Sequence, residues 1–341
     1  MKVAILGATG VVGREMLRTL EERSFPVDDL VPLASPRSEG VRVPFRGEEL
    51  TVRAVEPDAF NGIDLALFSP GATASREWAP RAVERGAVVV DNSSGFRMDP
   101  NVPLVIPELN ADAIAGHHGI IANPNCTAIT ALMAVGPLHR QAGLSRMVVS
   151  SYQSVSGMGR KGVQELLEQI EKLRGQEEDL ERPDPASLPA GEVFGRTIAY
   201  NVLPRGGTFG EDGVTTEEQK MTDESRKILD APDLEVSMTV VRVPVLVGHS
   251  VSIHAEFSRP LPPDEAREVL SAAPGVEVVD DPSADRFPTP LDAAGRDEVL
   301  VGRIRRAAER QDALLLFSSG DNLRKGAALN AVQIAERLAT G

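Results

Sequence analysis

Two side chains of this sequence are suited to covalent and proton-transfer chemistry. Cys126 is the only cysteine in 341 residues, so it can form neither an internal disulfide nor a thiolate zinc cluster. It follows Asn123-Pro124-Asn125 and precedes a long apolar stretch with helical character, which places it at the N-terminus of a helix. The helix dipole there favours a thiolate, so we expect a lowered pKa and a nucleophilic thiol. The alternative is an inert, buried cysteine.

A nucleophilic thiol needs a partner for proton transfer, and His249 is the best of the five histidines. His249 is the last residue of the segment Arg242–His249, an otherwise apolar stretch that Pro244 and Gly248 interrupt. Seven residues of unbroken strand would put Arg242 and His249 on opposite faces, so both reach one cavity only if the chain bends between them. A salt bridge for Arg242 and an ordinary turn histidine are the competing interpretations.

The charge balance points to a small anionic substrate and away from nucleic acid. Lys and Arg number 36 against 50 Asp and Glu, a net charge of −14, and aromatic residues make up only 4%. Such a chain repels polyanions and has few rings on which bases could stack. Cations within polar motifs therefore mark docking points for an anion, and these are Arg97, Arg242 and Lys220. Lys220 shares a helix face with Glu217 after a Thr215–Glu218 capping box, although a surface ion pair would explain that pair equally well.

A glycine-rich run near the N-terminus is suited to binding a dinucleotide. Gly7-Ala8-Thr9-Gly10-Val11-Val12-Gly13 follows a strand and opens a helix, where backbone N–H groups can hold a pyrophosphate. After the second strand, Ser35 and Ser38 flank Arg37, a set that favours the 2′-phosphate of NADP over the ribose hydroxyl of NAD. A solvated turn is the alternative for Arg37.

These groups must be positioned by two domains, as the length of the chain also indicates. The first half predicts a doubly wound parallel sheet, with strands at Val3–Leu6, Leu30–Leu33, Asp64–Phe68, Ala87–Val90 and Ile120–Ala122 and helices at Gly13–Arg23 and Thr73–Arg85. The second half predicts an α+β domain with longer alternating strands at Glu235–Val243 and Val251–Phe257, a surface loop over Gly175–Gly191, and a final amphipathic helix, Leu329–Leu338, packed back on the first domain. We expect a Rossmann-type NADP-binding domain of residues 1–125 plus 323–341 and a catalytic and dimerisation domain of residues 126–322.

Neither a membrane segment nor a secretory signal is expected. No stretch approaches the roughly 20 apolar residues of a spanning helix, and the glycine-rich N-terminus lacks a cleavage site. Together with the single cysteine, this predicts a cytoplasmic protein.

Seven motifs in one order resemble the aspartate-semialdehyde dehydrogenase family over nearly the whole chain. They are GATGVVG, DNSSGFRMD, NPNCTA, SYQSVSG, EEQKMTDESRKIL, RVPVLVGHS and NLRKGAALNAVQIAE. Departures are confined to Ala128, where a hydroxyl residue is common, and to a looser match over Glu192–Gly210. The resemblance implies an NADP-dependent, phosphorylating aldehyde dehydrogenase, an oxidoreductase that reduces 4-aspartyl phosphate to L-aspartate 4-semialdehyde through a cysteine thioester. It serves lysine, diaminopimelate, threonine and methionine biosynthesis and is usually a homodimer.

The resemblance also implies a role for each matching residue. Cys126 is the nucleophile, His249 the acid/base and Gln153 the residue that orients the intermediate. Arg242 binds the substrate α-carboxylate, Glu217 the ammonium, and Arg97, Lys220 and Asn125 the phosphate. No metal is implied. The implied cofactor contacts are Gly7, Thr9, Gly10, Val11, Val12, Gly13, Ser35, Arg37, Ser38, Ser156, Gly157 and Asn322.

Two alternative functions remain open at this stage. N-acetyl-γ-glutamyl-phosphate reductase uses similar chemistry, but a glycine usually precedes its cysteine where this chain has Asn125, and its acylated substrate gives Glu217 no ammonium to bind. A non-catalytic NADPH-sensing or redox-sensing module would keep the dinucleotide fold and an oxidisable thiol. Turnover of one acyl phosphate and not the other, or binding without turnover, would separate these possibilities.

Overall fold

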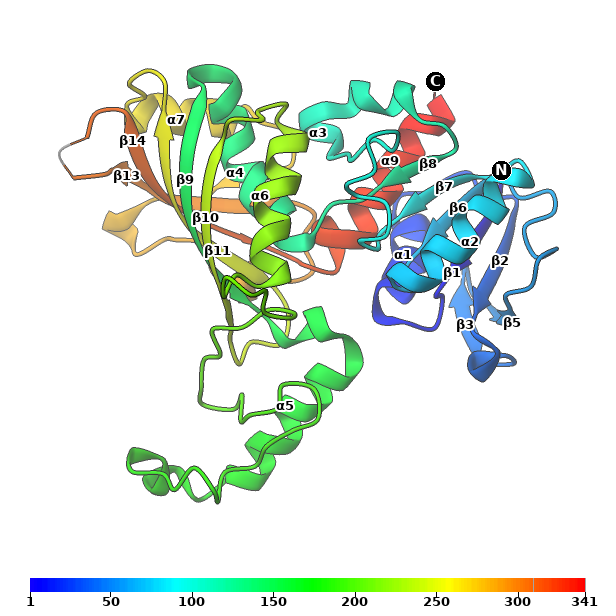
Figure 1. The fold of residues 1–341 in the computed structure, drawn as a ribbon, viewed down its shortest axis with the longest axis horizontal. Coiled ribbons are helices and arrows are strands. Elements are labelled where there is room, and N and C mark those ends of the chain that lie inside the picture. The colour runs from blue at the N-terminus through cyan, green and yellow to red at the C-terminus, as the bar shows by residue number, and fades with distance from the viewer. Residues whose placement is uncertain (309, 341) are drawn as a thin grey trace.

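The computed structural model describes residues 1–308 and 310–340, and these form two six-stranded sheets that lie side by side (Figure 1). The first sheet has the order β5-β2-β1-β6-β7-β8, and all of its pairs are parallel. Its strands are β1 (Lys2–Leu6), β2 (Asp29–Ala34), β5 (Arg53–Ala54), β6 (Leu65–Phe68), β7 (Val88–Asp91) and β8 (Ile120–Ala122). The doubly wound parallel sheet predicted for the first half is confirmed, with each predicted strand shifted by no more than one residue at either end.

Both faces of the first sheet are covered by helices, as a parallel sheet requires. Val3 and Ile5 of β1 pack with α1 (Val11–Glu22) and α9 (Leu329–Thr340). Ala4 and Leu6 point to the opposite face and pack with α2 (Ala72–Glu84). A hairpin of β3 (Arg42–Phe45) and β4 (Glu48–Thr51) flanks this sheet. The final helix therefore packs on the first sheet, as its amphipathic pattern predicted.

The second sheet is mixed and has the order β10-β9-β11-β14-β13-β12. Its strands are β9 (Leu144–Gln153), β10 (Glu235–Arg242), β11 (His249–Phe257), β12 (Val276–Val278), β13 (Val299–Arg306) and β14 (Ala313–Gly320). Helices α4 (Cys126–Ala142), α6 (Thr216–Ile228) and α7 (Pro263–Ser271) contribute to one core with it. Val148 and Tyr152 on the other face of β9 are 39% and 38% exposed, which agrees with alternating strands whose second face is left to solvent or to an interface.

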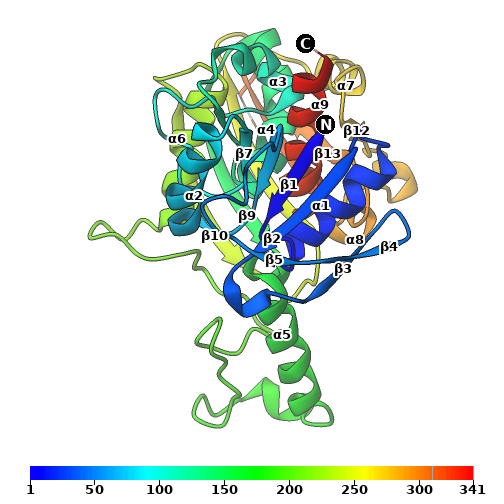
Figure 2. The ribbon, with the colours of Figure 1, turned by 90° about the vertical axis from the view of Figure 1, so that its right-hand side faces the viewer.

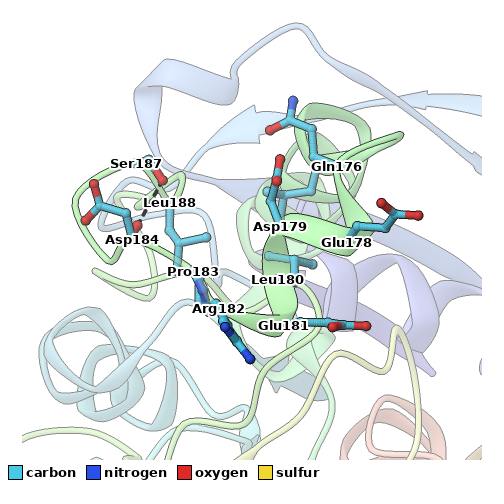
Figure 3. Close-up of a pocket in the computed structure, with 11 residues that line it drawn as sticks. Gln176, Glu178, Asp179, Leu180, Glu181, Arg182, Pro183, Asp184, Ser187 and Leu188 are labelled. Atoms are coloured by element: carbon cyan, nitrogen blue, oxygen red, sulfur yellow. Dashed lines mark hydrogen bonds between the residues drawn. The ribbon is translucent and has the colours of Figure 1, made fainter.

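Helix α5 (Gly159–Leu173) and the segment after it form an arm that projects away from both sheets (Figures 1 and 2). A small apolar cluster that includes Leu166, Leu173 and Ile198 holds the arm together. The predicted surface loop lies at its end, but it contains one 3-10 turn, η4 (Glu177–Glu181). A cavity of about 520 Å³ lies there, and none of the residues predicted to act in chemistry lines it. Figure 3 shows the mainly acidic and polar side chains that do.

The remaining short helices lie in the connections between these elements. They are η1 (Pro36–Ser38), α3 (Pro107–Asn110), η2 (Ala111–Gly116), η3 (Val155–Met158), η5 (Pro282–Ala284), α8 (Pro290–Ala293) and the π-helical turn η6 (Arg324–Ala328). The turn η6 leads from β14 of the second sheet into α9 on the first. Across residues 1–308 and 310–340, no helix is both long and apolar enough to span a membrane.

Candidate active site

Cys126 is the first residue of α4, as its flanking motif predicted. The side chain of Asn125 caps this helix, because its Oδ1 accepts the backbone N–H groups of Thr127 at 2.9 Å and Ala128 at 3.4 Å. The expected low thiol pKa is wrong for this state. Burial raises the pKa of Cys126, the Glu217 carboxylate adds to the shift, and the charges of Arg97 and Arg242 only partly oppose it.

Arg242 and His249 converge because their strands both flank the end of β9. Arg242 of β10 pairs with Gln153, and Ser250 of β11 pairs with Tyr152. The chain between the two strands turns back through Gly248, whose φ is +94° and whose N–H donates to Asn322 Oδ1 at 2.9 Å. The bend that the sequence required between Arg242 and His249 is thus present.

Gly157 lies at the point where these two side chains meet. A Cβ built on Gly157 would lie 2.8 Å from Arg242 Nη1 and 3.3 Å from His249 Nε2. Gly157 also lines the cavity that contains Cys126. The absence of a side chain therefore leaves room for the guanidinium and the imidazole beside the thiol cavity.

His249 is fully buried, and its hydrogen bonds define its tautomer. Its Nδ1 accepts the backbone N–H of Ser154 at 3.1 Å, so the proton of the neutral ring is on Nε2. Nε2 has no hydrogen-bond partner among the described residues. Burial, and next the charge of Arg242, lower the pKa of His249 to about 3. The ring is therefore a neutral hydrogen-bond donor at neutral pH.

The SYQSVSG segment supplies a buried polar network behind the imidazole. Gln153 Nε2 donates to Thr127 Oγ1 at 2.8 Å, which orients the Gln153 amide beside Cys126. Ser154 Oγ donates to Asn322 Oδ1 at 3.1 Å, and Asn322 Nδ2 donates to Ser156 Oγ at 3.0 Å. Sequence reasoning missed Ser154 and Thr127, although both are hydroxyl residues next to predicted site residues.

Two of the charged residues predicted to bind substrate, Glu217 and Lys220, form a cluster with Asn125. The Thr215–Glu218 capping box is present at the start of α6, and it places Glu217 and Lys220 in an ion pair. Asn125 Nδ2 donates to Glu217 Oε2 at 2.9 Å. Burial alone would raise the pKa of Glu217, but Lys220, the Asn125 hydrogen bond and the charge of Arg97 together outweigh it and hold the pKa below its usual value. The pair is thus part of a polar cluster beside the thiol, and not an isolated surface pair.

Arg97 is also buried here, and its partner is a residue that sequence reasoning missed. Its Nη1 donates to Glu224 Oε1 at 2.9 Å, and Glu224 is 1% exposed. Glu217, Lys220, Glu224 and Lys227 follow one another at spacings of three, four and three residues along α6. That helical spacing of charges is the signal that could have identified Glu224.

The predicted dinucleotide loop has the geometry that a pyrophosphate requires. A Cβ at Gly13 would lie 2.2 Å from Gly7 O, so only glycine lets α1 start this close to β1. No side chain caps α1, and the N–H groups of its first turn have no acceptors within the helix. Thr9 Oγ1 lies 3.4 Å from Ser38 Oγ, which places the loop beside the segment that carries the exposed Arg37. These residues fit a bound NADP or NAD.

A cavity of about 240 Å³ joins the two halves of the site. It is lined by residues from the start of α1, from the ends of β6 and β7, from the NPNC segment and from SYQSVSG and η6: Val12, Ser69, Gly71, Asn92, Ser93, Arg97, Asn123, Pro124, Asn125, Cys126, Ser156, Gly157, Asn322, Leu323, Gly326 and Ala327. Among the described residues, Gln153, Glu217, Lys220 and His249 do not line this cavity, and Arg242 lines a separate groove of about 830 Å³. Within the same part of the chain, no cluster of three or more His, Cys, Asp or Glu side chains is arranged to hold a metal ion.

Comparison with known proteins finds two family domains in this chain. Residues 2–117 match the family described as semialdehyde dehydrogenase, NAD binding domain, and residues 135–325 match semialdehyde dehydrogenase, dimerisation domain. The aspartate-semialdehyde dehydrogenase of Aquifex aeolicus is 50% identical over 341 residues, covering 99% of this chain and 97% of the relative. The chain belongs to the aspartate-semialdehyde dehydrogenase family. The resemblance of its motifs is therefore confirmed.

Other members of the family agree in sequence and in structure. The aspartate-semialdehyde dehydrogenase of Mycolicibacterium smegmatis is 50% identical and covers 99% of both chains. The crystal structure of aspartate semialdehyde dehydrogenase II complexed with ASA from Vibrio cholerae has a TM-score of 0.93 and 43% identity, and it covers 99% of this chain and 98% of its own. The expected homodimer agrees with the dimerisation domain that the second half matches. An NAD-binding domain is likewise present, whereas the choice of NADP over NAD is a separate question.

Proposed function

We propose that this protein catalyses the reversible, NADP-dependent reductive dephosphorylation of 4-aspartyl phosphate to L-aspartate 4-semialdehyde. One observation carries the proposal: the cavity that contains the Cys126 thiol also contains Arg97 and opens onto the start of α1 at Val12. A nucleophile, an anion-binding cation and a dinucleotide loop thus share one space. The membership of the aspartate-semialdehyde dehydrogenase family supplies the substrate.

Cys126 is the nucleophile of the first step. Its thiolate attacks the carbonyl carbon of the acyl phosphate, a C–S bond forms, and the C–O bond to phosphate breaks. The thiol of the free protein has a raised pKa, and the Glu217 carboxylate is one of the causes. A substrate ammonium bound to Glu217 offsets that negative charge, so substrate binding itself favours the thiolate.

His249 and Gln153 act on the thioester that results. Bound NADPH supplies the hydride that reduces the thioester carbon. As the acid/base, His249 uses the proton on its Nε2. This N–H donates a hydrogen bond to the carbonyl oxygen as negative charge develops there. Gln153, held by Thr127, orients the acyl group, and Cys126 leaves as a thiolate when the aldehyde forms.

The substrate charges are assigned to the cluster around Asn125. Arg242 presents a guanidinium fork for the α-carboxylate, while Arg97, Lys220 and Asn125 provide N–H donors for phosphate. Lys220 and Glu217 are paired with each other in the free protein, so a substrate with both charges exchanges one ion pair for two.

The cofactor is assigned as NADP because of Arg37 and its neighbours. Arg37 is exposed between Ser35 and Ser38, so its guanidinium and two hydroxyls can surround a 2′-phosphate. The glycine loop would hold the pyrophosphate, and Ser156, Gly157 and Asn322, which line the cavity that contains Cys126, would hold the nicotinamide end.

The domain organisation follows from the same assignment. We assign residues 1–125 and 323–341 to NADP binding and residues 126–322 to catalysis and dimerisation, and we expect a cytoplasmic homodimer. The chain leaves the first sheet after β8 and returns to it through η6 and α9, which supports a first domain made of two segments.

The test follows NADP⁺ reduction by the purified protein with L-aspartate 4-semialdehyde, with and without phosphate, beside the Cys126→Ala variant. We expect phosphate-dependent reduction that the variant loses, with its NADPH affinity kept. A folded wild type that binds NADPH without turnover would support a sensing module, and turnover of only the N-acetylglutamyl analogue would support the reductase of that substrate. Retained turnover in Cys126→Ala would rule out the thioester.

A further inference from the structure

On the helix face that carries the pair assigned to the substrate, α6 has two further charged residues, Glu224 and Lys227. Glu217, Lys220, Glu224 and Lys227 share one face because of their spacing. Glu217 and Lys220 face Asn125, whereas Glu224 and Lys227 contact the segment that carries Arg97. One helix face thus touches every part of the anion-binding cluster.

Glu224 links two of these parts through a single buried carboxylate. Its Oε1 accepts Arg97 Nη1 at 2.9 Å, and its Oε2 accepts the backbone N–H of Asn125 at 2.6 Å. Burial raises the pKa of Glu224, yet both oxygens accept from donors, so these bonds stabilise the ionised form. Burying a carboxylate without partners is strongly unfavourable, so the two hydrogen bonds are what allow Glu224 to be buried in the site.

The other contacts of Arg97 and Asn125 show what Glu224 alone provides. Arg97 Nε donates to Asn123 O at 2.9 Å and Nη2 donates to Asn92 O at 2.8 Å, so two neutral carbonyls place the guanidinium without offsetting its charge. The Asn125 side chain is used in capping α4 and in binding Glu217. Glu224 therefore supplies the carboxylate that is bonded to Arg97 and the acceptor for the backbone just before Cys126.

We propose that Glu224 is a positioning residue for the Cys126 chemistry, which it serves by anchoring the Asn125 backbone to the Arg97 guanidinium and by offsetting the Arg97 charge beside the thiol. This inference rests on the proposed function, in which Cys126 is the nucleophile and Arg97 and Asn125 bind phosphate. Glu224 acts through these residues, since it is buried behind them. It explains why a strongly cationic residue can sit beside the thiol while the thiol of the free protein stays protonated.

Glu224→Gln removes both parts of this role. A glutamine amide has one accepting oxygen, so it cannot accept from both Arg97 and Asn125, and its NH₂ group would face one of those donors. The two carbonyls still hold Arg97, whose charge is then no longer offset. Of the charged groups around the thiol, Arg97 and Arg242 favour the thiolate and Glu217 opposes it, so the variant has a lower thiol pKa and a poorly placed nucleophile.

The experiment compares wild type, Glu224→Gln and Lys227→Met as full chains. Lys227 is the matched control, because its Nζ donates to the backbone carbonyls of Arg97 at 2.8 Å, Asp99 at 2.7 Å and Val102 at 2.8 Å and so holds the same segment without bonding to the guanidinium or to Asn125. The readouts are the pH dependence of iodoacetamide alkylation, the steady-state kcat and the KM for phosphate. Because Cys126 is the only cysteine, alkylation reports this thiol alone.

We expect Glu224→Gln to lower the midpoint of the alkylation profile by about one pH unit, the effect of removing one buried charge nearby. We also expect kcat to fall at least about tenfold and the KM for phosphate to rise, whereas Lys227→Met keeps the wild-type midpoint. A midpoint that stays at the wild-type value in Glu224→Gln, or moves equally in Lys227→Met, would overturn the proposal.

Two further comparisons keep the result decisive. If Glu224→Gln does not fold, Glu224→Asp replaces it, because aspartate keeps the charge but is one methylene too short to reach both donors. Glu224→Asp should lose turnover while the midpoint of its alkylation profile stays at the wild-type value. Wild-type turnover in a folded Glu224→Asp would contradict the role of Glu224. Alkylation needs neither substrate nor cofactor. A wild-type protein without phosphate-dependent turnover would therefore refute the proposed function. The alkylation midpoints of wild type and Glu224→Gln would still test whether Glu224 affects the thiol.

Discussion

Gly157 offers the most direct test of how Arg242 and His249 are held beside the thiol cavity. Its backbone lies outside the left-handed region, so alanine can adopt the same conformation. The added Cβ would lie 2.8 Å from Arg242 Nη1 and 3.3 Å from both Cε1 and Nε2 of His249. Gly157→Ala therefore displaces these two side chains and leaves their functional groups unchanged.

The size of the effect follows from these distances. Ordinary van der Waals contact begins at 3.4 Å, so the guanidinium must move by about 0.6 Å to accept a Cβ now at 2.8 Å. The same Nη1 donates to Ser154 O at 2.8 Å, and that bond must lengthen or break. Since a misplacement of about 1 Å can cost about 100-fold in rate, we expect kcat/KM to fall by roughly 10- to 100-fold.

Stability should also fall in this variant. Alanine restricts the unfolded chain, which stabilises by about 0.4–1 kcal/mol, while the crowding costs about 1–3 kcal/mol, so we expect a net loss of stability of up to about 2.6 kcal/mol. The assay measures kcat, the KM for aldehyde and phosphate, and Tm. Gly116→Ala is the control, because its Cβ would have no neighbour within 4 Å among the described residues. A kcat/KM within twofold of wild type in Gly157→Ala would show that the present positions of Arg242 and His249 are not required.

Three other predictions concern charge at the site. Arg242→Lys cannot keep the bond to Ser154 and also fork a carboxylate, so kcat/KM for the aldehyde should fall by roughly 10- to 100-fold, mainly through KM, and an unchanged KM would remove Arg242 from substrate binding. The pKa of His249 is depressed to about 3 in the folded state, so its contribution to stability is complete above the unfolded pKa of about 6.5 and is lost as the pH falls towards 3. Between pH 7 and pH 5, urea unfolding should therefore show wild type losing about 2 kcal/mol that His249→Gln does not lose, and parallel curves would contradict the neutral ring. Arg37→Ala should raise the KM for NADP⁺ at least about tenfold and leave that for NAD⁺ nearly unchanged, and an equal effect on both would place the 2′-phosphate elsewhere.

The first sheet was predictable in detail because its signals are local. Five of its six strands are short apolar runs, and a parallel sheet buried on both faces leaves few other arrangements. The two-residue strand β5, Arg53–Ala54, has no such run and was not predicted. The second sheet was predictable only as strands. Its order depends on pairings such as Arg242 with Gln153, which lie far apart in the chain, and no local pattern states that β10 joins β9 in parallel while β11 joins it antiparallel.

The features of the candidate site likewise fall into those that local sequence predicts and those that only tertiary structure sets. The position of Cys126 at a helix start and the Thr215–Glu218 capping box follow from neighbouring residues, and both were predicted. The thiol pKa was predicted in the wrong direction. A helix N-terminus favours the thiolate wherever it lies, but the burial of Cys126 and the nearby carboxylate of Glu217 come from elements distant in sequence and outweigh it.

Local sequence is therefore sufficient for the parts of this protein whose physics is local: the glycine loop, the helix caps, the alternation of strands and helices, and the position of Cys126 at a helix start. Tertiary structure alone decided how Gly157 makes room for Arg242 and His249, which nitrogen of His249 carries the proton, and that Glu224 joins Arg97 to Asn125. The physical reason is that desolvation, charge offset and close packing depend on every neighbour in space. Backbone propensity and capping depend only on the few residues that are adjacent in the chain.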